Sequence, residues 1–302
     1  MKHAFLITAH AYFDQLDDIV SLLSSPCHYF FINIDRKAGA GGGYLIESCK
    51  QKYPNVFFLE GDQRMEVAHG GYTQIECTLR LLHMAYDMGC DYFHLISGQD
   101  YPCRPNREFD KFFEENVGRS YMQIESPEYH EPCMVHKYPS RVQPWYIRDC
   151  PHRDIAIVDF FVKAFNKISQ HFFIRKMIPG LWGSWNWFSW HRSLAEYVIR
   201  EENENPKFFQ RFHHTSCADE LIFSTLFHGH EQELNIDGTN ALRYINWEKK
   251  VEGRTHIGSP LTLNEDEYED IIQSGAFFCR KVHPVISKKL LEMLRANIQR
   301  QD

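Results

Sequence analysis

Strand-like apolar runs alternate with helical stripes along the first 125 residues. The apolar runs, each short enough for a buried strand, are residues 4–8, 29–34, 56–59, 92–97 and 120–124. Apolar side chains recur three and four residues apart in the segments 15–23, 72–88 and 106–116. Strands that alternate with helices predict βαβ units. The pattern therefore indicates an α/β fold with a mostly parallel central sheet flanked by helices.

The second half of the chain is less regular. Residues 126–152 are rich in proline, histidine and tyrosine with little periodicity, so we expect a long surface loop there. Helices are expected over residues 155–168, 194–200, 219–226 and 285–299, and an aromatic strand over 185–190. The chain carries no internal repeats or low-complexity tracts. We expect residues 1–302 to form a single large domain.

Residues 39–43, GAGGG, are interpreted as a flexible loop. They lack the Lys-Ser/Thr that completes a P-loop, so no phosphate cradle is predicted there.

Composition and charge narrow the function classes. The chain has 33 Lys and Arg against 40 Asp and Glu, and a net charge of -7 argues against a protein whose main role is to coat nucleic acid or anionic membrane. No apolar run is long enough to cross a bilayer, and the N-terminal stretch leads into acidic residues without a signal-peptide cleavage site. Nine cysteines without metal-type spacing are typical of reduced thiols. We therefore expect a cytoplasmic protein, for which peripheral membrane association stays open.

Polar residues follow three of the predicted strands. His10 follows the first strand and Asp35 the second. Asp100 follows the strand in the stretch YFHLISGQDYPCRP, and Pro102 comes two residues after it. The carboxyl ends of parallel strands share one edge of a sheet, where ligands bind, so these side chains are expected to converge on one crevice. The structural alternatives are an ordinary turn at Asp100 and a buried, hydrogen-bonded His10.

Asn33 and Asp35 form a degenerate Asp-x-Asp pair. Side chains at i and i+2 share a face of a strand, so both could reach one cation. One carboxylate and one amide are a small ligand set for Mg²⁺ or Mn²⁺, and metal binding is kept as an alternative.

Two charged clusters complete the candidate chemistry. Asp219 and Glu220 open a predicted helix, where acids serve either as ordinary helix-start residues or as a general base, and the sequence alone leaves both readings open. Arg280 and Lys281 follow an apolar run, either as a solvated strand end or as cations for a diphosphate, and Arg254 could add to their field.

Eight segments together resemble the core-2/I-branching family of glycosyltransferases, which includes β-1,6-N-acetylglucosaminyltransferases and peptide O-xylosyltransferases. The segments are AFLITAH, INIDRKA, HGGYTQIECTL, LISGQDYPCRP, GSWNWFSW, ADELIF, LRYINW and SGAFFCRKV. Their order over most of the chain carries the resemblance. It implies a GT-A-like fold, a UDP-sugar donor, inversion at the anomeric carbon and no metal or other cofactor.

The resemblance also implies roles at the donor side. It makes Glu220 the catalytic base and Lys281, beside Arg280, the contact to the donor diphosphate. Asp35 would lie at the uridine, close to the segment Thr8, Ala9 and His10. Asp100 would line the cleft between donor and acceptor. Residues 1–125 would then be the nucleotide-sugar-binding half and residues 126–302 the acceptor and catalytic half.

Acceptor contacts are implied in the same way for Glu125, Arg141 and Trp247. Trp185, Trp187 and Trp247 would offer apolar faces to sugar rings, although the aromatic run WNWFSW is equally typical of a core strand.

The sequence departs from the family pattern at two positions. The arginine that precedes the diphosphate lysine by about two dozen residues maps onto Gly258, and Arg254 lies four residues earlier, where it could substitute. His69 stands where the family often has tryptophan. Animal members are Golgi proteins with a membrane anchor, whereas this sequence begins at the catalytic domain, so we expect a bacterial, cytoplasmic member acting on polysaccharide.

The expected reaction is transfer of a sugar from a UDP-sugar to a glycan or polysaccharide hydroxyl, with N-acetylglucosamine as the expected sugar. The alternatives are transfer of xylose, a metal-dependent reaction through Asn33 and Asp35, and a carbohydrate-binding protein without catalysis.

Overall fold

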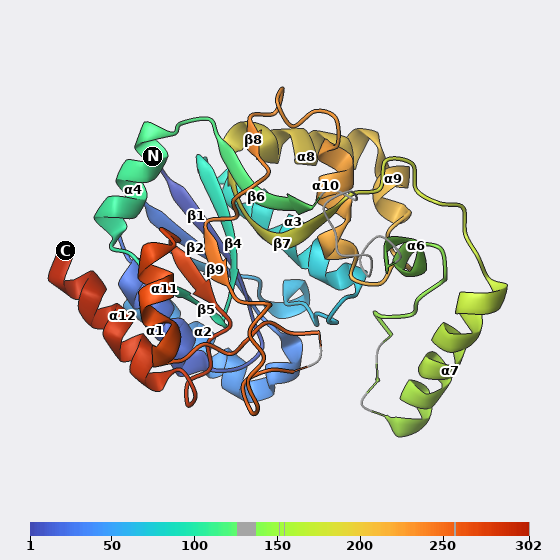
Figure 1. Ribbon diagram of the computed structural model, residues 1–302, viewed down its shortest axis with the longest axis horizontal. Coiled ribbons are helices and arrows are strands. Elements are labelled where there is room, and N and C mark those ends of the chain that lie inside the picture. The colour runs from blue at the N-terminus through green and yellow to red at the C-terminus, as the bar shows by residue number, and fades with distance from the viewer. Residues whose placement is uncertain (126–136, 151, 154, 257, 302) are drawn as a thin grey trace.

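A seven-stranded sheet forms the centre of the molecule (Figure 1). The computed structural model describes residues 1–125, 137–150, 152–153, 155–256 and 258–301. Its large sheet has the order β3-β2-β1-β4-β7-β6-β8. The strands are β1 (His3–Ala9), β2 (His28–Ile34), β3 (Val56–Phe58), β4 (Tyr92–Ser97), β6 (Ser120–Glu125), β7 (Gly183–His191) and β8 (Ile236–Asp237).

Most neighbours in this sheet run parallel. β1 pairs in parallel with β2 and β4, β2 with β3, and β6 with β8, whereas β7 is antiparallel to β4 and β6. The predicted α/β fold with a mostly parallel sheet is confirmed. β7 belongs to the second half of the chain yet lies between β4 and β6, so both halves build one sheet.

Helices cover both faces of the sheet (Figure 1). One face is covered by α1 (Phe13–Leu23), α2 (Gly39–Lys52), α4 (Asn106–Glu115), α11 (Tyr268–Gln273) and α12 (Lys288–Gln301). The other is covered by α3 (Tyr72–Asp87), α8 (Arg192–Glu204), α9 (Pro206–Gln210) and α10 (Ile222–Phe227). In β1, Phe5 and Ile7 pack in the first layer and Ala4 and Leu6 in the second, all fully buried. Burial on both faces explains why the run is apolar throughout.

A small second sheet packs on the face of the first that α1 and α4 cover, next to the end of β4. It has the order β5-β10-β9, with β5 (Asp100–Pro102), β10 (Phe278–Arg280) and β9 (Arg243–Ile245). Asp100 stands opposite Arg280 in its register. Residues far apart in sequence are thereby brought to the end of β4.

The interpretation of residues 39–43 as a loop is wrong, because they form the first turns of α2. The glycines fit a close approach: a Cβ on Gly42 would collide with the Arg64 guanidinium and would lie 2.8 Å from Ile34 Cγ2. That guanidinium donates to Ile34 O at 2.6 Å and to Asp35 O at 2.8 Å. Packing of Ile46 against the core outweighs the low helix propensity of glycine.

Two further segments differ in detail from the expectation. The helix predicted over 219–226 is a 3₁₀ turn (Ala218–Glu220) followed by α10. The loop predicted over 126–152 contains α6 (Lys137–Val142), and residues 126–136 lie outside the described residues. The expected helix over 155–168 is confirmed as α7 (Ala156–Phe172).

Candidate active site

The carboxyl ends of β1, β2 and β4 meet at one edge of the sheet. The backbone nitrogen of Asp35 donates to Ala9 O at 2.7 Å, and that of Gly98 donates to Thr8 O at 3.1 Å. The chain order switches here, because β2 and β3 lie on one side of β1 and β4 lies on the other. Ligands bind at such switch points in open α/β sheets. His10 follows β1 as an exposed residue rather than a buried one.

Asp100 organises the loop after β4. Its buried Oδ2 accepts from Ser97 N at 2.8 Å and Ser97 Oγ at 2.6 Å, and pairs with Arg280 Nη1 at 2.9 Å. The Arg280 guanidinium carbon lies 3.9 Å from the centre of the Trp187 ring, a cation–π contact. Arg280 is therefore no solvated strand end, since only 13% of its side chain is exposed.

Lys281 is the less engaged cation of the pair. Its half-buried Nζ has one long contact within the described segments, 3.5 Å to Ser259 Oγ. Burial, with a smaller effect from the Arg280 charge, lowers the pKa of the Lys281 ammonium. Val282 N donates to Gln99 O at 3.0 Å and fixes Lys281 beside the end of β4. An ammonium so placed can receive an anionic group.

Arg254 faces a different set of partners. Its Nε donates to Thr262 O at 2.9 Å, and its guanidinium pairs with Asp266 at 3.3 Å and with the buried Glu267. Lys249 also pairs with Glu267, at 2.7 Å. Arg254 is thus held in an ion-pair network with Asp266 and Glu267, whereas Lys281 is not part of that network.

Asn33 and Asp35 fasten the segment that precedes α3. Asp35 Oδ1 accepts from Lys37 N at 2.8 Å and Oδ2 accepts from Val67 N at 3.0 Å. Asn33 Oδ1 accepts from Met65 N at 2.9 Å. A cation bound by this pair would have to replace these hydrogen bonds.

The acid pair lies against the start of α3. Cys217, at φ 51°, donates its backbone nitrogen to Gly70 O at 2.9 Å. Gly70 has φ 68°, and a Cβ there would lie 3.0 Å from Cys217 Sγ, so glycine permits this close approach. The segment from Met65 to Gly70 thus runs from Asp35 to the acid pair and joins the two parts of the site.

Asp219 and Glu220 have different environments. Asp219 is buried, its Oδ2 accepts from Gln74 Nε2 at 2.8 Å, and its Oδ1 lacks a hydrogen-bond partner in the described part of the chain. Burial, followed by the nearby Glu220 charge, raises the pKa of Asp219 to about 7. Glu220 is 39% exposed and pairs with Arg141 Nη1 at 2.6 Å. Of the two carboxylates, Glu220 is the one that a substrate can reach.

Two polar residues were missed as site residues. Gln74 holds Asp219, and Asp149 caps α3 by accepting from Tyr72 N at 2.7 Å and Thr73 Oγ1 at 2.6 Å. The segment HGGYTQ, read only as a family motif, already contained Gln74. Asp149 lies in an irregular loop and gave no periodic or spacing signal.

The aromatic run divides between core and site. Between two paired positions, the three residues Trp185 to Trp187 of β7 stand opposite Gln123 alone in β6, so they form a bulge, a device that redirects side chains beside active sites. Trp185 Nε1 donates to Glu125 Oε1 at 3.0 Å, whereas Phe188 and Trp190 are buried and stack at 3.5 Å. Trp247, the other aromatic candidate, is 43% exposed.

A surface cavity of about 640 Å³ lies beside the segment from Met65 to Gly70. Its lining includes Arg36, Lys37, His69, Arg148 and Asp149. None of the predicted site residues lines it.

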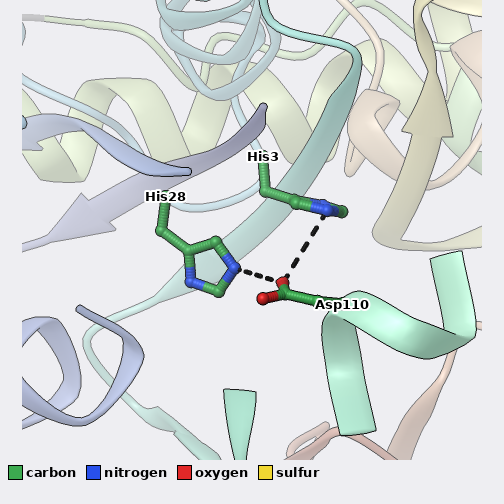
Figure 2. Close-up of side chains that lie close together, drawn as sticks. All are labelled: His3, His28 and Asp110. Atoms are coloured by element: carbon green, nitrogen blue, oxygen red, sulfur yellow. Dashed lines mark hydrogen bonds and ion pairs between the residues drawn. The ribbon is translucent and has the colours of Figure 1, made fainter. Parts of the chain in front are cut away.

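The buried His3 and His28 form a cluster with the partly buried Asp110 at the opposite edge of the sheet (Figure 2). His28 Nε2 lies 2.7 Å from Asp110 Oδ1, and His3 Nε2 lies 3.9 Å from the same oxygen. Burial alone would lower the pKa of His28, but hydrogen bonds led by Asp110 raise it to about 9. Burial lowers the pKa of His3 to about 3. These three could geometrically hold a metal, yet 2.7 Å is the length of a direct charged hydrogen bond.

A family model described as Core-2/I-Branching enzyme matches residues 3–271. The dog (Canis lupus familiaris) protein named Xylosyltransferase 2 is 22% identical over an alignment of 315 positions that covers 97% of this chain and 33% of that protein. A human protein named probable β-1,3-galactosyl-O-glycosyl-glycoprotein β-1,6-N-acetylglucosaminyltransferase 7 is 23% identical over 129 residues, 40% of this chain and 29% of that protein. The chain thus spans about a third of the relatives' length.

Solved structures are more distant. UDP-glucose pyrophosphorylase from Leishmania major has a TM-score of 0.31 and 9% identity over 66% of this chain and 52% of that chain, values too low to carry an argument. Among the described helices, none is both long and apolar enough to cross a membrane.

Proposed function

This chain belongs to the Core-2/I-branching enzyme family, and from that premise we propose that it is an inverting glycosyltransferase that uses a UDP-sugar donor and a glycan acceptor. The observation that carries the proposal is the placement of Glu220. This half-exposed carboxylate is held by Arg141 and joined, through residues 65–70, to the strand ends at Asp35.

In the proposed reaction, Glu220 accepts the proton of an acceptor hydroxyl. The hydroxyl oxygen forms a bond to the anomeric carbon from the face opposite UDP. The bond from that carbon to the diphosphate oxygen breaks, and UDP leaves with the electron pair. One displacement inverts the configuration, and general-base help of this kind contributes about 10² to 10⁴ in rate.

Lys281 is proposed to offset the charge on the leaving diphosphate. Its ammonium has weak internal contacts, whereas Arg280 shares its charge with Asp100 and Arg254 with Glu267. Fixed cations at a developing negative charge stabilise a transition state without reorganisation. The proposal therefore needs no metal at the diphosphate.

The acceptor side is proposed to include Glu125, Arg141, Trp185 and Trp247. In the β7 bulge, Trp185 donates a hydrogen bond to Glu125, and Trp187 makes the cation–π contact with Arg280. The same strand therefore contacts residues proposed for the acceptor sugar and for the UDP-sugar. Exposed aromatic faces suit the apolar sides of sugar rings.

Two sugar donors, UDP-N-acetylglucosamine and UDP-xylose, are proposed for this reaction. The family resemblance favours N-acetylglucosamine, while relatives that align over 97% of this chain are named xylosyltransferases. The metal-dependent reaction and the non-catalytic carbohydrate-binding protein remain as rivals that the same experiment separates.

We would measure UDP release from purified protein with UDP-N-acetylglucosamine and with UDP-xylose, each in EDTA and in Mn²⁺. Release with one donor in EDTA supports the metal-free reaction and identifies the sugar. Release only in Mn²⁺ rejects the metal-free mechanism and points to Asn33 and Asp35. A parallel titration measures UDP binding, and glycan binding without UDP binding would favour the carbohydrate-binding rival.

A further inference from the structure

Helix α7 exposes an apolar stripe along its length. Ile157, Phe161, Ile168 and Phe172 are spaced four, seven and four residues apart, which places them on one face of a helix. They are 64%, 63%, 50% and 77% exposed, respectively. Figure 1 shows α7 at the periphery, away from the central sheet. A surface helix normally turns such a stripe toward the core.

The helix is attached to the body through polar groups instead. Asn166 Oδ1 accepts from Ile147 N at 2.8 Å, and Asn166 Nδ2 donates to Ile147 O at 3.2 Å. Ser169 Oγ donates to Trp145 O at 2.5 Å. Ser169 and Val162 are the buried residues of α7. These contacts fix the helix with its apolar stripe facing outward.

The exposed apolar surface continues past the end of the helix. Phe173, Ile174 and Met177 are 51%, 54% and 41% exposed. Together with the four stripe residues they form a contiguous stretch of sequence rich in exposed aromatic and aliphatic side chains, which we call the α7 patch. Exposed apolar patches of this kind mark surfaces that bind a partner or a membrane.

Lysines border the α7 patch. Lys163, Lys167 and Lys176 are exposed, and Asp159, which pairs with Lys163 at 2.6 Å, is the one acid between residues 156 and 177. The whole chain carries a net charge of -7, so this cationic border is a local reversal of charge. Apolar side chains flanked by lysines fit the interface of an anionic bilayer.

A second copy of the chain fits this surface less well. In a two-fold pair the same patch faces itself, and the lysine borders of both copies would come together. α7 is seventeen residues long and carries the charged side chains of Asp159, Lys163 and Lys167. Such a helix suits a position in the interface rather than across the bilayer.

We propose that the α7 patch binds the surface of an anionic lipid bilayer, with the stripe residues inserted among the lipids and the lysines at the headgroups. The proposal rests on the α7 patch and its bordering lysines alone and is independent of the reaction proposed above.

The test is flotation of the full chain with phosphatidylcholine vesicles and with vesicles that also contain phosphatidylglycerol. We expect at least a tenfold higher bound fraction on the anionic vesicles, reduced by salt. Phe161→Gln combined with Phe172→Gln should lower binding about tenfold. Tyr44→Gln combined with Val285→Gln is the matched control, because these side chains are 80% and 77% exposed elsewhere, and it should bind like the parent.

Charge is tested separately with Lys167→Glu combined with Lys176→Glu, against Lys111→Glu combined with Lys207→Glu as the control. The first pair should lose binding to anionic vesicles and the second should keep it. The proposal is overturned if the parent protein stays in solution with both vesicle types, or if the Phe161/Phe172 variant floats as well as the parent. Sedimentation that finds a dimer, lost in that variant, would assign the patch to a second copy instead.

Discussion

At the residue scale, the two neighbouring carboxylates are expected to respond differently to removal of charge. Glu220→Gln should lower kcat by about 10² to 10⁴ while UDP binding stays within about threefold, because the amide cannot accept the hydroxyl proton. Asp219→Asn retains an oxygen for Gln74 and should cost less. UDP release and calorimetric titration with UDP measure the two effects. A Glu220→Gln enzyme with parental turnover would reject the assignment.

Substitutions of Lys281 and Arg254 are expected to affect different properties, catalysis for Lys281 and folding stability for Arg254. Lys281→Ala should lose about 2 to 4 kcal/mol of transition-state stabilisation, seen in kcat/KM, with little change in urea unfolding. Arg254→Ala leaves the buried Glu267 without its closest cation and should cost about 3 kcal/mol in unfolding free energy. Equal losses of unfolding free energy in both variants would contradict this division.

Several residue-level pairings lay beyond the sequence. Arg141 and Glu220 are 79 positions apart and meet across an irregular loop, so no periodicity links them. Asp100 was recognised as a strand-end acid, but its partner Arg280 is set by the pairing of β5 with β10, a long-range contact. Local patterns identify the residue types of a site, whereas tertiary pairing decides which of them are free to act.

At the scale of elements, strands and long helices followed their apolar periodicity closely. β1, β2 and β4 are buried on both faces and are largely apolar, interrupted by Asn33 in β2 and His94 in β4, and α3 carries a clear stripe. The exception is α2, whose glycine-rich start has no stripe. The close approach of Arg64, which fixes that start, involves a residue about twenty positions away and leaves no local signal.

The bond from His28, at the start of β2, to Asp110, on α4, predicts a pH-dependent contribution to stability. His28 has its folded pKa raised from 6.5 to about 9, so its contribution is complete below pH 6.5 and is lost as pH rises through 9. Asp110 has a lowered folded pKa, so its contribution is present above pH 3.8 and is lost as pH falls through the folded value. The pair therefore stabilises the fold between about pH 4 and pH 9.

Asp110→Asn should accordingly lower the unfolding free energy by about 1 to 3 kcal/mol near pH 6, and the deficit should shrink by pH 10. Thermal unfolding of both proteins across this range measures it. Glu114→Gln, an exposed acid on the same helix, is the control and should show no such trend. A deficit that stays constant from pH 6 to pH 10 would argue that the ion pair contributes nothing.

At the scale of the whole molecule, the proposed site draws on both halves of the chain around one sheet. Strand ends of the first half supply Thr8, Ala9 and Asp35, and the second half supplies Glu220 and Lys281. A cut between the halves would separate β7 from both of its neighbours, β4 and β6. The nucleotide-sugar half and the acceptor half are thus expected to be functional regions of one folding unit.

The hydrogen bonds between α7 and residues 145–147 also have a mechanical side. A short stretch of chain leads from Ile147 back to Arg141, the arginine that holds Glu220. We expect a displacement of α7 to be transmitted along this stretch to Asp219 and Glu220. We therefore expect kcat to change when anionic vesicles capture the helix. An unchanged kcat on saturating vesicles would mean that α7 is not coupled to the acid pair and that adsorption only brings the enzyme to the membrane surface.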